Sequence, residues 1–333
     1  MRRFLAGLLF AASALAAVPA WAQKTVTFAY QDMMNPWRWV QQSQEVEKAT
    51  GFKINWRQFG GGGDVIRAMA SGDVQLGEVG STGIATAISQ GMDVELFWVL
   101  EDIAAAEALV ARNGSGVNSI ADLKGKKVGT PFVSTSHFQL LYALQKAGLK
   151  ASDVQVLNMR PPEIAAAWGR GDIDATFIWD PVLSTVKKTG KVLVTSGDIC
   201  KDGACTFDGL IVTRKFAKEN PEFMVALVKA LAKADADYRA SAKAWTGDAA
   251  KVAAVAKWSG GKPEDVADAM ALYGFPSLKD QASPAWLGGG ASGAASKALA
   301  QQANFLKEQG RLTSVVPDYS KNVTIEWVTK AMN

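Results

Sequence analysis

Hydrophobic and polar residues follow two alternating patterns along the first two-thirds of the chain. Short apolar or alternating segments are typical of strands, and the segments between them repeat apolar positions at the spacing of amphipathic helices. Strands separated by helices predict an α/β protein with open, mostly parallel sheets and helices on both faces. The predicted strands are 25–30, 52–59, 74–79, 94–100, 107–112, 127–130, 154–158, 173–179, 192–195 and 207–213.

The pattern changes after Thr213. The rest of the chain is rich in Ala and amphipathic, and it predicts helices only, at 221–245, 248–258, 263–273, 294–309 and 323–331. No series of strands remains for a further domain. We therefore expect these helices to pack back against the first part of the fold.

Two segments of the chain resemble each other. Val65–Ser81 and Ile164–Asp180 each contain a short helix that ends in Gly-Asp, followed by a strand that leads to a corner. Gly-Asp after a helix is also common punctuation, so chance is an alternative explanation. A true relationship predicts two related lobes that present strand ends to a shared cleft, where ligands of open α/β sheets bind.

The N-terminal residues have the features of a signal peptide. Arg2 and Arg3 precede an uncharged, apolar run, and Ala20-Trp21-Ala22 matches a signal-peptidase site. We predict a signal peptide at 1–22 and an exported, soluble product. Without the two arginines the net charge falls from +4 to +2, because this segment contains no acidic residue. A nearly balanced charge without a basic stripe argues against nucleic acid as a partner.

Cys200 and Cys205 are the only cysteines, and the segment between them contains Gly203. In an oxidising compartment these two cysteines are predicted to form a small disulfide loop. A zinc site is not expected, because the chain has one His and lacks further ligands of the kind zinc requires. We predict neither a metal nor a cofactor.

One corner of the predicted fold is suited to an anion. After the strand at 127–130, Ser134, Thr135 and Ser136 place hydroxyls at the start of a helix that begins near His137. Unpaired N–H groups and the helix dipole favour negative charge there. The alternative is that Ser134 is only a helix N-cap. The glycines at 60–63 lack both a complete G-x-G-x-x-G pattern and a Walker lysine, which leaves a flexible turn or a backbone wall for a ligand.

With these motifs laid out, the chain resembles the periplasmic solute-binding proteins of ABC importers, and most of all their taurine-binding branch. The resemblance runs nearly end to end through 29–31, 65–75, 80–81, 107–110, 131–137, 171–174, 179 and 305–310. It implies the type II fold of two lobes joined by two crossing strands, for which 107–112 and 207–213 are the candidates. The implied lobes are 23–112 with 207–333, and 113–206.

The resemblance also implies a two-ended site for a zwitterion. The sulfonate is assigned to Ser81, Thr82, Thr135, Ser136 and His137. The ammonium is assigned to Asp208, with Glu107 second, while Trp179 covers the cation or the linker and Gln31 closes the cleft. Burying these charges requires many hydrogen bonds.

Each assignment has an alternative in which the residue only supports the fold. Ser81 caps a helix, Trp179 belongs to the core, and the two carboxylates pair with nearby arginines, Glu107 with Arg112 and Asp208 with Arg214. Taken singly, Glu107 and His137 favour this structural interpretation, whereas Thr135 and Asp208 favour the functional one.

The resemblance implies a monomeric binding protein in the periplasm that delivers taurine to a membrane permease, and not an enzyme. An alkanesulfonate or hypotaurine is the alternative ligand, because the loops at 32–37 and 200–205 depart from the usual taurine-binding pattern. Two further alternatives are an enzyme similar to thiamin-pyrimidine synthases and a sensor subunit that presents ligand to a receptor.

Overall fold

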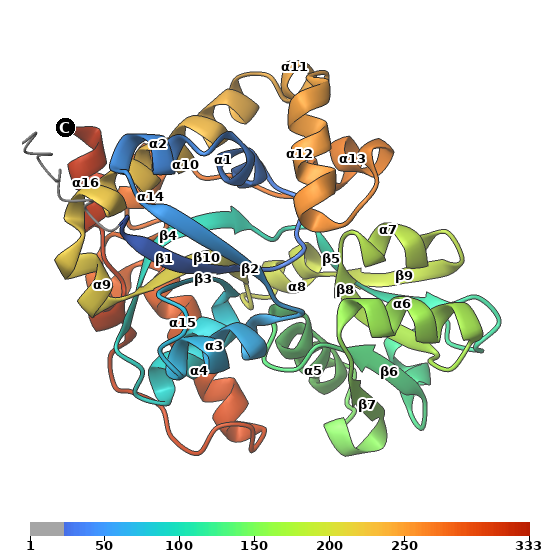
Figure 1. Ribbon diagram of the computed structural model, residues 1–333. Coiled ribbons are helices and arrows are strands. Elements are labelled where there is room, and N and C mark those ends of the chain that lie inside the picture. The colour runs from blue at the N-terminus through green and yellow to red at the C-terminus, as the bar shows by residue number, and fades with distance from the viewer. Residues whose placement is uncertain (1–22) are drawn as a thin grey trace, which may run out of the picture.

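The computed structural model describes residues 23–333, so the predicted signal peptide at 1–22 lies outside the described residues. Two five-stranded sheets organise the chain, with strand orders β2-β1-β3-β10-β4 and β7-β6-β8-β5-β9. The strands are β1 (Thr25–Tyr30), β2 (Lys53–Gln58), β3 (Leu76–Gly80), β4 (Val94–Asp102), β5 (Glu107–Arg112), β6 (Lys127–Thr130), β7 (Gln155–Asn158), β8 (Ala175–Trp179), β9 (Gly190–Thr195) and β10 (Phe207–Thr213). Figure 1 shows the sheets as two lobes side by side, the second one mainly in green.

The two sheets share one arrangement. In the first lobe, β1 is parallel to β2 and β3, and β10 runs antiparallel between β3 and β4. In the second lobe, β6 is parallel to β7 and β8, and β5 runs antiparallel between β8 and β9. The similar segments Val65–Ser81 and Ile164–Asp180 therefore occupy equivalent places. Each contains a parallel strand, β3 or β8, that pairs with the antiparallel strand of its sheet. The α/β fold predicted from the sequence is confirmed.

The predicted lobe boundary at residue 112 is wrong. Glu107–Arg112 was expected in the first lobe, but its backbone pairs with β8 and β9 of the second sheet. It is buried on both faces over most of its length, which suits a central strand. The chain therefore crosses between lobes after β4, before Glu107, and returns between β9 and β10.

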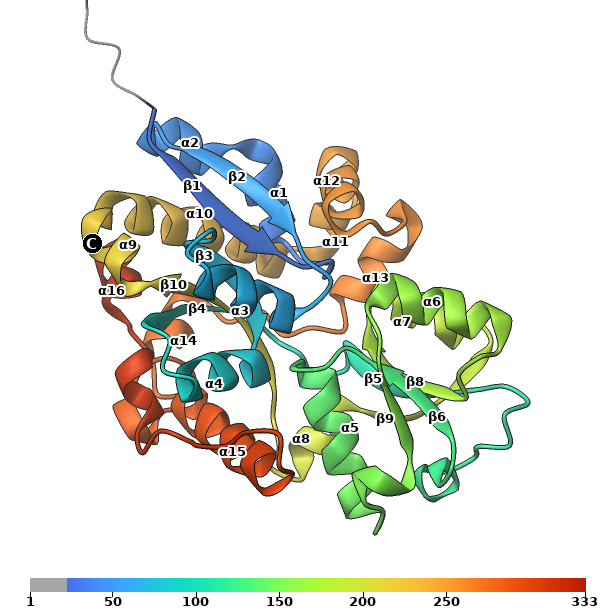
Figure 2. The ribbon, with the colours of Figure 1, turned by 60° about the horizontal axis from the view of Figure 1, so that its bottom comes forward.

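Helices cover both sheets, as Figure 2 shows for α3, α4 and α5 near the junction of the lobes. The helices up to the second crossing are α1 (Trp37–Ser43), α2 (Glu45–Thr50), α3 (Gly62–Ala70), α4 (Ser81–Ser89), α5 (Thr135–Lys146), α6 (Pro161–Arg170), α7 (Val182–Lys187) and α8 (Ser196–Lys201). The later ones are α9 (Arg214–Glu219), α10 (Pro221–Ala240), α11 (Ala242–Thr246), α12 (Ala249–Ser259), α13 (Val266–Met270), α14 (Leu278–Ala282), α15 (Ala294–Glu308) and α16 (Glu326–Met332).

Some predicted helices are divided in the structure, and some helices of the structure were not predicted. The helix expected at 221–245 is broken at Ser241, whose extended backbone separates α10 from α11 and whose hydroxyl caps α11. The segment at 263–273 holds a short 3₁₀ turn and α13. Neither α8 nor α14 was predicted, because each is too short to show a helical period.

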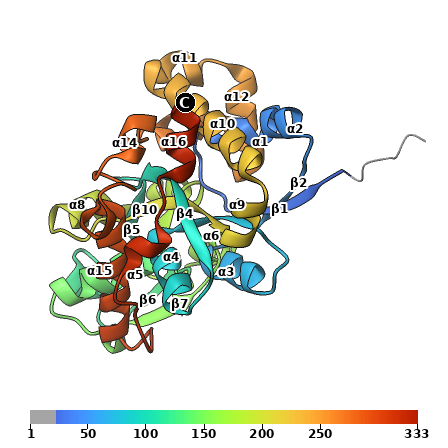
Figure 3. The same cartoon turned by 90° about the vertical axis from the view of Figure 1, so that its left-hand side faces the viewer.

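The C-terminal helices pack mainly against the first lobe. Figure 3 shows α15 alongside α4, and apolar residues of α10, α15 and α16 belong to the same core as β1, β3, β4 and β10. Phe305 of α15 also reaches the core of the second lobe, where its ring lies 5.2 Å from that of Phe138. None of the helices among residues 23–333 is long and apolar enough to cross a membrane.

Candidate functional site

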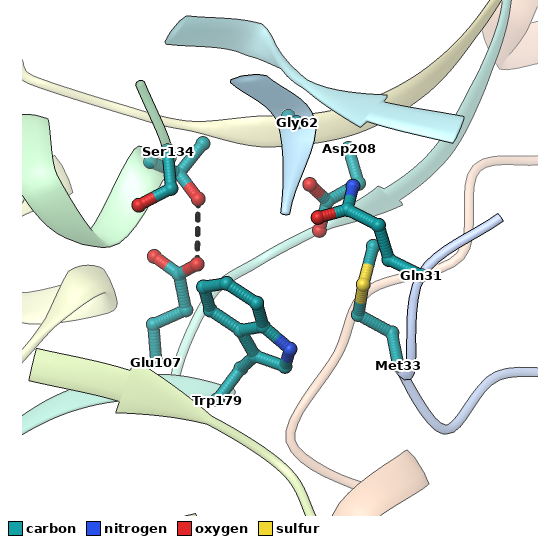
Figure 4. Close-up of a pocket in the computed structure, with 9 residues that line it drawn as sticks. Gln31, Met33, Gly62, Glu107, Ser134, Trp179 and Asp208 are labelled. Atoms are coloured by element: carbon teal, nitrogen blue, oxygen red, sulfur yellow. Dashed lines mark hydrogen bonds between the residues drawn. The ribbon is translucent and has the colours of Figure 1, made fainter. Parts of the chain in front are cut away.

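A small cavity lies between the two lobes, at the ends of the strands (Figure 4). The first lobe contributes residues from the segment after β1, the start of α3 and the β3/β10 pair. The second lobe contributes the first residue of β5, the start of α5 and the end of β8. The cavity is lined by Gln31, Met33, Gly62, Gly80, Glu107, Ser134, Thr135, Trp179 and Asp208.

Equivalent strand pairs supply the centre of this cavity from both lobes. Asp208 of β10 lies opposite Gly80 of β3 in the first sheet, and Glu107 of β5 lies opposite Trp179 of β8 in the second. In each lobe, a carboxylate on the antiparallel strand is thus placed beside the carboxyl end of a parallel strand. The position matches the place where open α/β sheets bind ligands.

Glu107 is buried and has no cationic partner in the cavity. Its Oε1 accepts a hydrogen bond of 2.5 Å from the Thr135 hydroxyl and its Oε2 accepts one of 3.3 Å from Ser196. Burial raises the pKa of Glu107 to about 7, against the opposing effect of these hydroxyl groups. The alternative partner Arg112 instead lies 4.0 Å from Asp174.

Asp208 presents a second buried carboxylate to the same cavity. The arginine suggested as its alternative partner, Arg214, pairs with Asp93 and Glu95 on the far end of β10. Burial raises the pKa of Asp208 well above its usual range, and the nearby carboxyls of Glu101 and Glu107 raise it further. Two uncompensated carboxyls that face one cavity favour a ligand with a positive charge.

A buried network supports the first-lobe wall of the cavity. The Arg38 guanidinium pairs with Glu78 at 3.0 Å, and neither side chain is exposed. The Gln31 side chain donates to the backbone carbonyl of Glu78 at 2.9 Å, and Asn35 donates to Glu101 at 3.1 Å. One Glu101 oxygen is buried without a partner. Arg38 thus compensates Glu78, and the acidic groups nearer the cavity stay in excess.

The opposite chemistry comes from helix starts. Ser134 caps α5, since its hydroxyl accepts from the backbone N–H of His137 at 3.1 Å and donates to the carbonyl of Pro131 at 2.6 Å. The first N–H groups of a helix lack intrahelical acceptors. Because Gly62 begins α3 and Ser134 precedes α5, two helices of opposite lobes begin at the cavity. These groups favour an anion.

Four predicted site residues are placed elsewhere. The hydroxyls of Ser81 and Thr82 donate to Gln302 of α15 at 3.0 and 2.7 Å, and neither residue lines the cavity. The Ser136 hydroxyl is buried near Glu107, whose pKa it helps to lower, but it lacks a well-formed hydrogen bond. The His137 ring stacks on Phe132 with 4.3 Å between centroids. Gln31, Glu107, Thr135, Trp179 and Asp208 do line the cavity.

The sole histidine is neutral and packed. Burial, aided by the charge of Arg311, lowers the pKa of His137 to about 4. Its Nε2 has no hydrogen-bond partner. Within residues 23–333, no group of three or more His, Cys, Asp or Glu side chains is arranged to hold a metal ion.

Some cavity residues were missed by sequence reasoning. Met33 was not predicted at the site. Gly80 belongs to the corner Gly80-Ser81 that ends the first of the two similar segments, but it was not assigned to the ligand, and Gly62 was suggested only as part of a backbone wall. A further contact, from the Trp179 indole N–H to Asp32 at 2.7 Å, joins the lobes beside the cavity. Cys200 and Cys205 form the predicted disulfide, with Cys200 on α8.

Comparison with known proteins extends these observations. A family model described as NMT1/THI5 like matches residues 48–242. The taurine-binding periplasmic protein of Escherichia coli strain K12 is 37% identical to this chain over 320 residues, which cover 96% of this chain and 97% of that protein.

Solved structures share the fold at lower identity. The periplasmic aliphatic sulphonate binding protein SsuA of Escherichia coli is 24% identical, with a TM-score of 0.71 over 92% of this chain and 99% of that one. The desulfurization enzyme DSZB is 15% identical, with a TM-score of 0.63 over 93% and 99%. The fold alone therefore does not separate binding from catalysis. The matching family model shows that this chain belongs to the NMT1/THI5-like family, and the nearly full-length similarity shows that it is related to the taurine-binding periplasmic protein of Escherichia coli.

Proposed function

We propose that this protein is the periplasmic substrate-binding subunit of an ABC importer for taurine. The observation that carries the proposal is the pair of buried, uncompensated carboxyls of Glu107 and Asp208, which face one cavity together with the starts of α3 and α5. Taurine has an ammonium at one end and a sulfonate at the other. The cavity offers an opposite charge preference for each end.

In this arrangement the ammonium lies between Glu107 and Asp208. The Trp179 ring, which lines the cavity beside both carboxylates (Figure 4), covers the cation or the two-carbon linker. The sulfonate accepts hydrogen bonds from backbone N–H groups near Gly62 and Ser134. The Thr135 hydroxyl already donates to Glu107, so it aligns the carboxylate and is not the main sulfonate donor. Gln31 completes the wall from the first lobe.

The same charges favour taurine over an alkanesulfonate. An alkanesulfonate has no cation, and its entry would leave both carboxyls buried without a counter-charge. Calorimetry with taurine, hypotaurine, ethanesulfonate and glycine betaine tests this order. We expect taurine to bind and ethanesulfonate to bind at least tenfold more weakly. Binding of ethanesulfonate without taurine would contradict the proposed ligand.

The variant Asp208→Asn tests the ammonium site directly. Asparagine keeps the size of the side chain but removes its charge, and a hydrogen bond to a charged group contributes about 1.5–3 kcal/mol. We expect taurine affinity to fall by roughly tenfold or more. Unchanged affinity would place the ammonium elsewhere.

We propose binding rather than catalysis. His137, the residue that an enzyme similar to thiamin-pyrimidine synthases would need, does not line the cavity and has a low pKa. Incubation with pyridoxal phosphate, followed by an absorbance scan, is expected to show no Schiff base. We further propose that the chain works as a monomer that meets a membrane permease. Multi-angle light scattering tests the monomer, and taurine uptake in cells that carry the permease separates import from a sensor role.

A further inference from the structure

Asp32 and Trp179 form a hydrogen bond that crosses from one lobe to the other. Asp32 follows β1 in the first lobe, and Trp179 ends β8 in the second. The indole Nε1 donates to Asp32 Oδ1 at 2.7 Å, although the residues are 147 positions apart. Trp179 lines the cavity and Asp32 does not. We propose that Asp32 is a positioning residue, which fixes the Trp179 ring as a cavity wall and holds the lobes closed over the ligand. The inference rests on the proposed binding function.

The backbone around Asp32 is held rigidly by Arg38. The Arg38 Nη2 donates to the carbonyl of Gln31 at 2.9 Å, and its Nε donates to the carbonyl of Met33 at 2.8 Å. These two residues flank Asp32. Arg38 is in turn fixed by the buried Glu78. The guanidinium thereby sets the direction of the Asp32 side chain before any ligand enters, because its planar fork holds both neighbouring peptide groups.

The residues beside Asp32 reach the same region of the second lobe. Met33 packs into the apolar cluster that contains Trp179, Ile178 and Val182. Met33 also lines the cavity, together with Gln31. The segment after β1 therefore lines the cavity with Gln31 and Met33, and its Asp32 accepts a hydrogen bond from the indole of Trp179, the aromatic side chain of the cavity.

On its other side Asp32 faces a groove between the lobes. Pro181 and Val182 of the second lobe and Gly261 and Lys262 of the first lobe line this groove. The Asp32–Trp179 bond separates the groove from the cavity, since Trp179 lines the cavity while Asp32 lines the groove. The bond forms only when the lobes are together, so its loss is expected to speed ligand release more than it slows capture.

A double-mutant cycle tests the pair. Asp32→Ala removes the acceptor, and Trp179→Phe keeps an aromatic ring but removes the N–H donor. Taurine affinity and dissociation rate are measured for the natural protein, both single variants and the double variant. We expect Asp32→Ala to weaken binding about tenfold, as for a hydrogen bond to a charged group. In the Trp179→Phe background the same change is expected to have little further effect. Asp32→Asn, which keeps an acceptor oxygen at this position, should retain most of the affinity of the natural protein.

A matched control exists within the first lobe. The Trp327 indole donates to Glu95 Oε1 at 2.9 Å, which joins α16 to β4 without crossing between lobes. Glu95→Ala and Trp327→Phe should alter stability without changing taurine release. Equal effects of the control pair and the Asp32 pair would reduce Asp32 to a structural role and overturn the inference.

The outcomes separate this inference from the proposed function. The cycle uses whichever compound of the calorimetry panel binds the natural protein, so failure of taurine alone counts against the proposed ligand. Additive effects of Asp32→Ala and Trp179→Phe overturn the positioning role whatever the ligand is. A readout that does not depend on affinity is the ¹⁵N–¹H indole resonance of Trp179, recorded with saturating bound compound and identified by its loss in Trp179→Phe. It should move in Asp32→Ala and stay in Glu95→Ala. An unmoved resonance in Asp32→Ala contradicts the bond.

Discussion

The Glu107 carboxyl is buried in a place where its negative charge is unfavourable unless a cation is bound beside it. Burial raises its pKa from 4.5 to about 7, so the folded protein holds a proton that the unfolded chain has already released in this range. The folded state is therefore favoured most by this group below about pH 4.5, and that contribution is lost as the pH rises towards 7. An ammonium in the cavity opposes this effect of burial on the pKa, because it stabilises the ionised carboxylate.

Glu107→Gln is expected to stabilise the ligand-free protein while weakening taurine binding. A shift of this size corresponds to roughly 3 kcal/mol of unfolding free energy. The variant should be more stable than the natural protein by about this amount at pH 8, and the difference should nearly vanish near pH 4.5. Urea unfolding at both pH values measures it. Calorimetry should show at least tenfold weaker taurine binding, and the fall in natural affinity between pH 8 and pH 6 should be smaller in the variant. Equal stability of the two proteins at pH 8 would contradict this assignment.

At the scale of single residues, the sequence predicts the carboxylates proposed for the ammonium better than the donors proposed for the sulfonate. Glu107 and Asp208 stand at strand ends, where chain order alone places them near a cleft. Ser81 and Thr82 also stand at such a corner, but their hydroxyls bond to Gln302 on α15. A partner more than two hundred positions away leaves no local signal.

The glycine run at 60–63 acts as a smooth contact surface for the second lobe. A side chain at Gly60 would meet the Arg160 side chain at 2.9 Å, and one at Gly63 would meet Val133 at 3.5 Å. Arg160 reaches across the lobes to Asp64 at 3.2 Å. The sequence suggested a flexible turn or a backbone wall. Besides the backbone wall that Gly62 contributes to the cavity, the structure shows how absent side chains allow the two lobes to approach.

Arg160→Ala is expected to speed taurine release modestly. The pair with Asp64 is largely exposed on the Arg160 side, and exposed ion pairs contribute up to about 1 kcal/mol, or roughly fivefold in affinity. The effect should shrink in high salt. Stopped-flow dissociation measures it, with Arg170→Ala as the control because Arg170 pairs with Asp172 inside the second lobe. Identical release rates for both variants would show that the Asp64 contact does not assist closure.

The disulfide loop is also tied to both lobes. Gln139 of α5 donates to the carbonyl of Ala204 at 2.9 Å, and Gln302 of α15 donates to that of Cys205 at 3.1 Å. Cys200→Ser with Cys205→Ser should therefore lower the unfolding free energy by about 2 kcal/mol, the value for so short a loop. Taurine affinity should change less than threefold, since the two glutamines still hold the segment before Asp208. Urea unfolding and calorimetry measure both, and a large loss of affinity would show that the glutamines alone do not suffice.

At the scale of the whole molecule, the two-lobe plan and the return of 207–213 to the first lobe follow from the sequence and its resemblance, but the place of Glu107–Arg112 in the second sheet does not. The repeated helix-strand segments predict two similar sheets. Each sheet, however, receives its antiparallel strand across a lobe crossing: β5 enters the second lobe directly after β4, and β10 returns to the first after β9. Glu107–Arg112 is apolar enough to suit either sheet. Only backbone pairing with strands far away in the sequence decides which sheet this segment joins, and the order of elements along the chain does not predict that pairing.

Closure of the lobes should depend on the absence of a side chain at Gly80. Its backbone, at φ −64° and ψ 152°, suits alanine. A Cβ there would lie 2.9 Å from Thr135 Cγ2 of the opposite lobe and 3.0 Å from an Asp208 oxygen. The contact with Asp208 lies within the first lobe and requires a shift of a few tenths of an ångström, whereas the conflict with Thr135 exists only while the lobes are together. Gly80→Ala should therefore preserve the fold of each lobe and oppose their closed arrangement.

The expected result is taurine binding weaker by roughly fivefold to hundredfold, because overpacking typically costs about 1–3 kcal/mol. Small-angle scattering should show a taurine-induced decrease in the radius of gyration for the natural protein and a smaller one for Gly80→Ala. Gly169→Ala on α6 is the control, since a Cβ there meets no atom within 4 Å. If Gly80→Ala bound taurine with natural affinity and full compaction, the lobes would have to trap the ligand with Thr135 further from Gly80 than it lies here. The ammonium site would then be wider than the space between Glu107 and Asp208 in this structure.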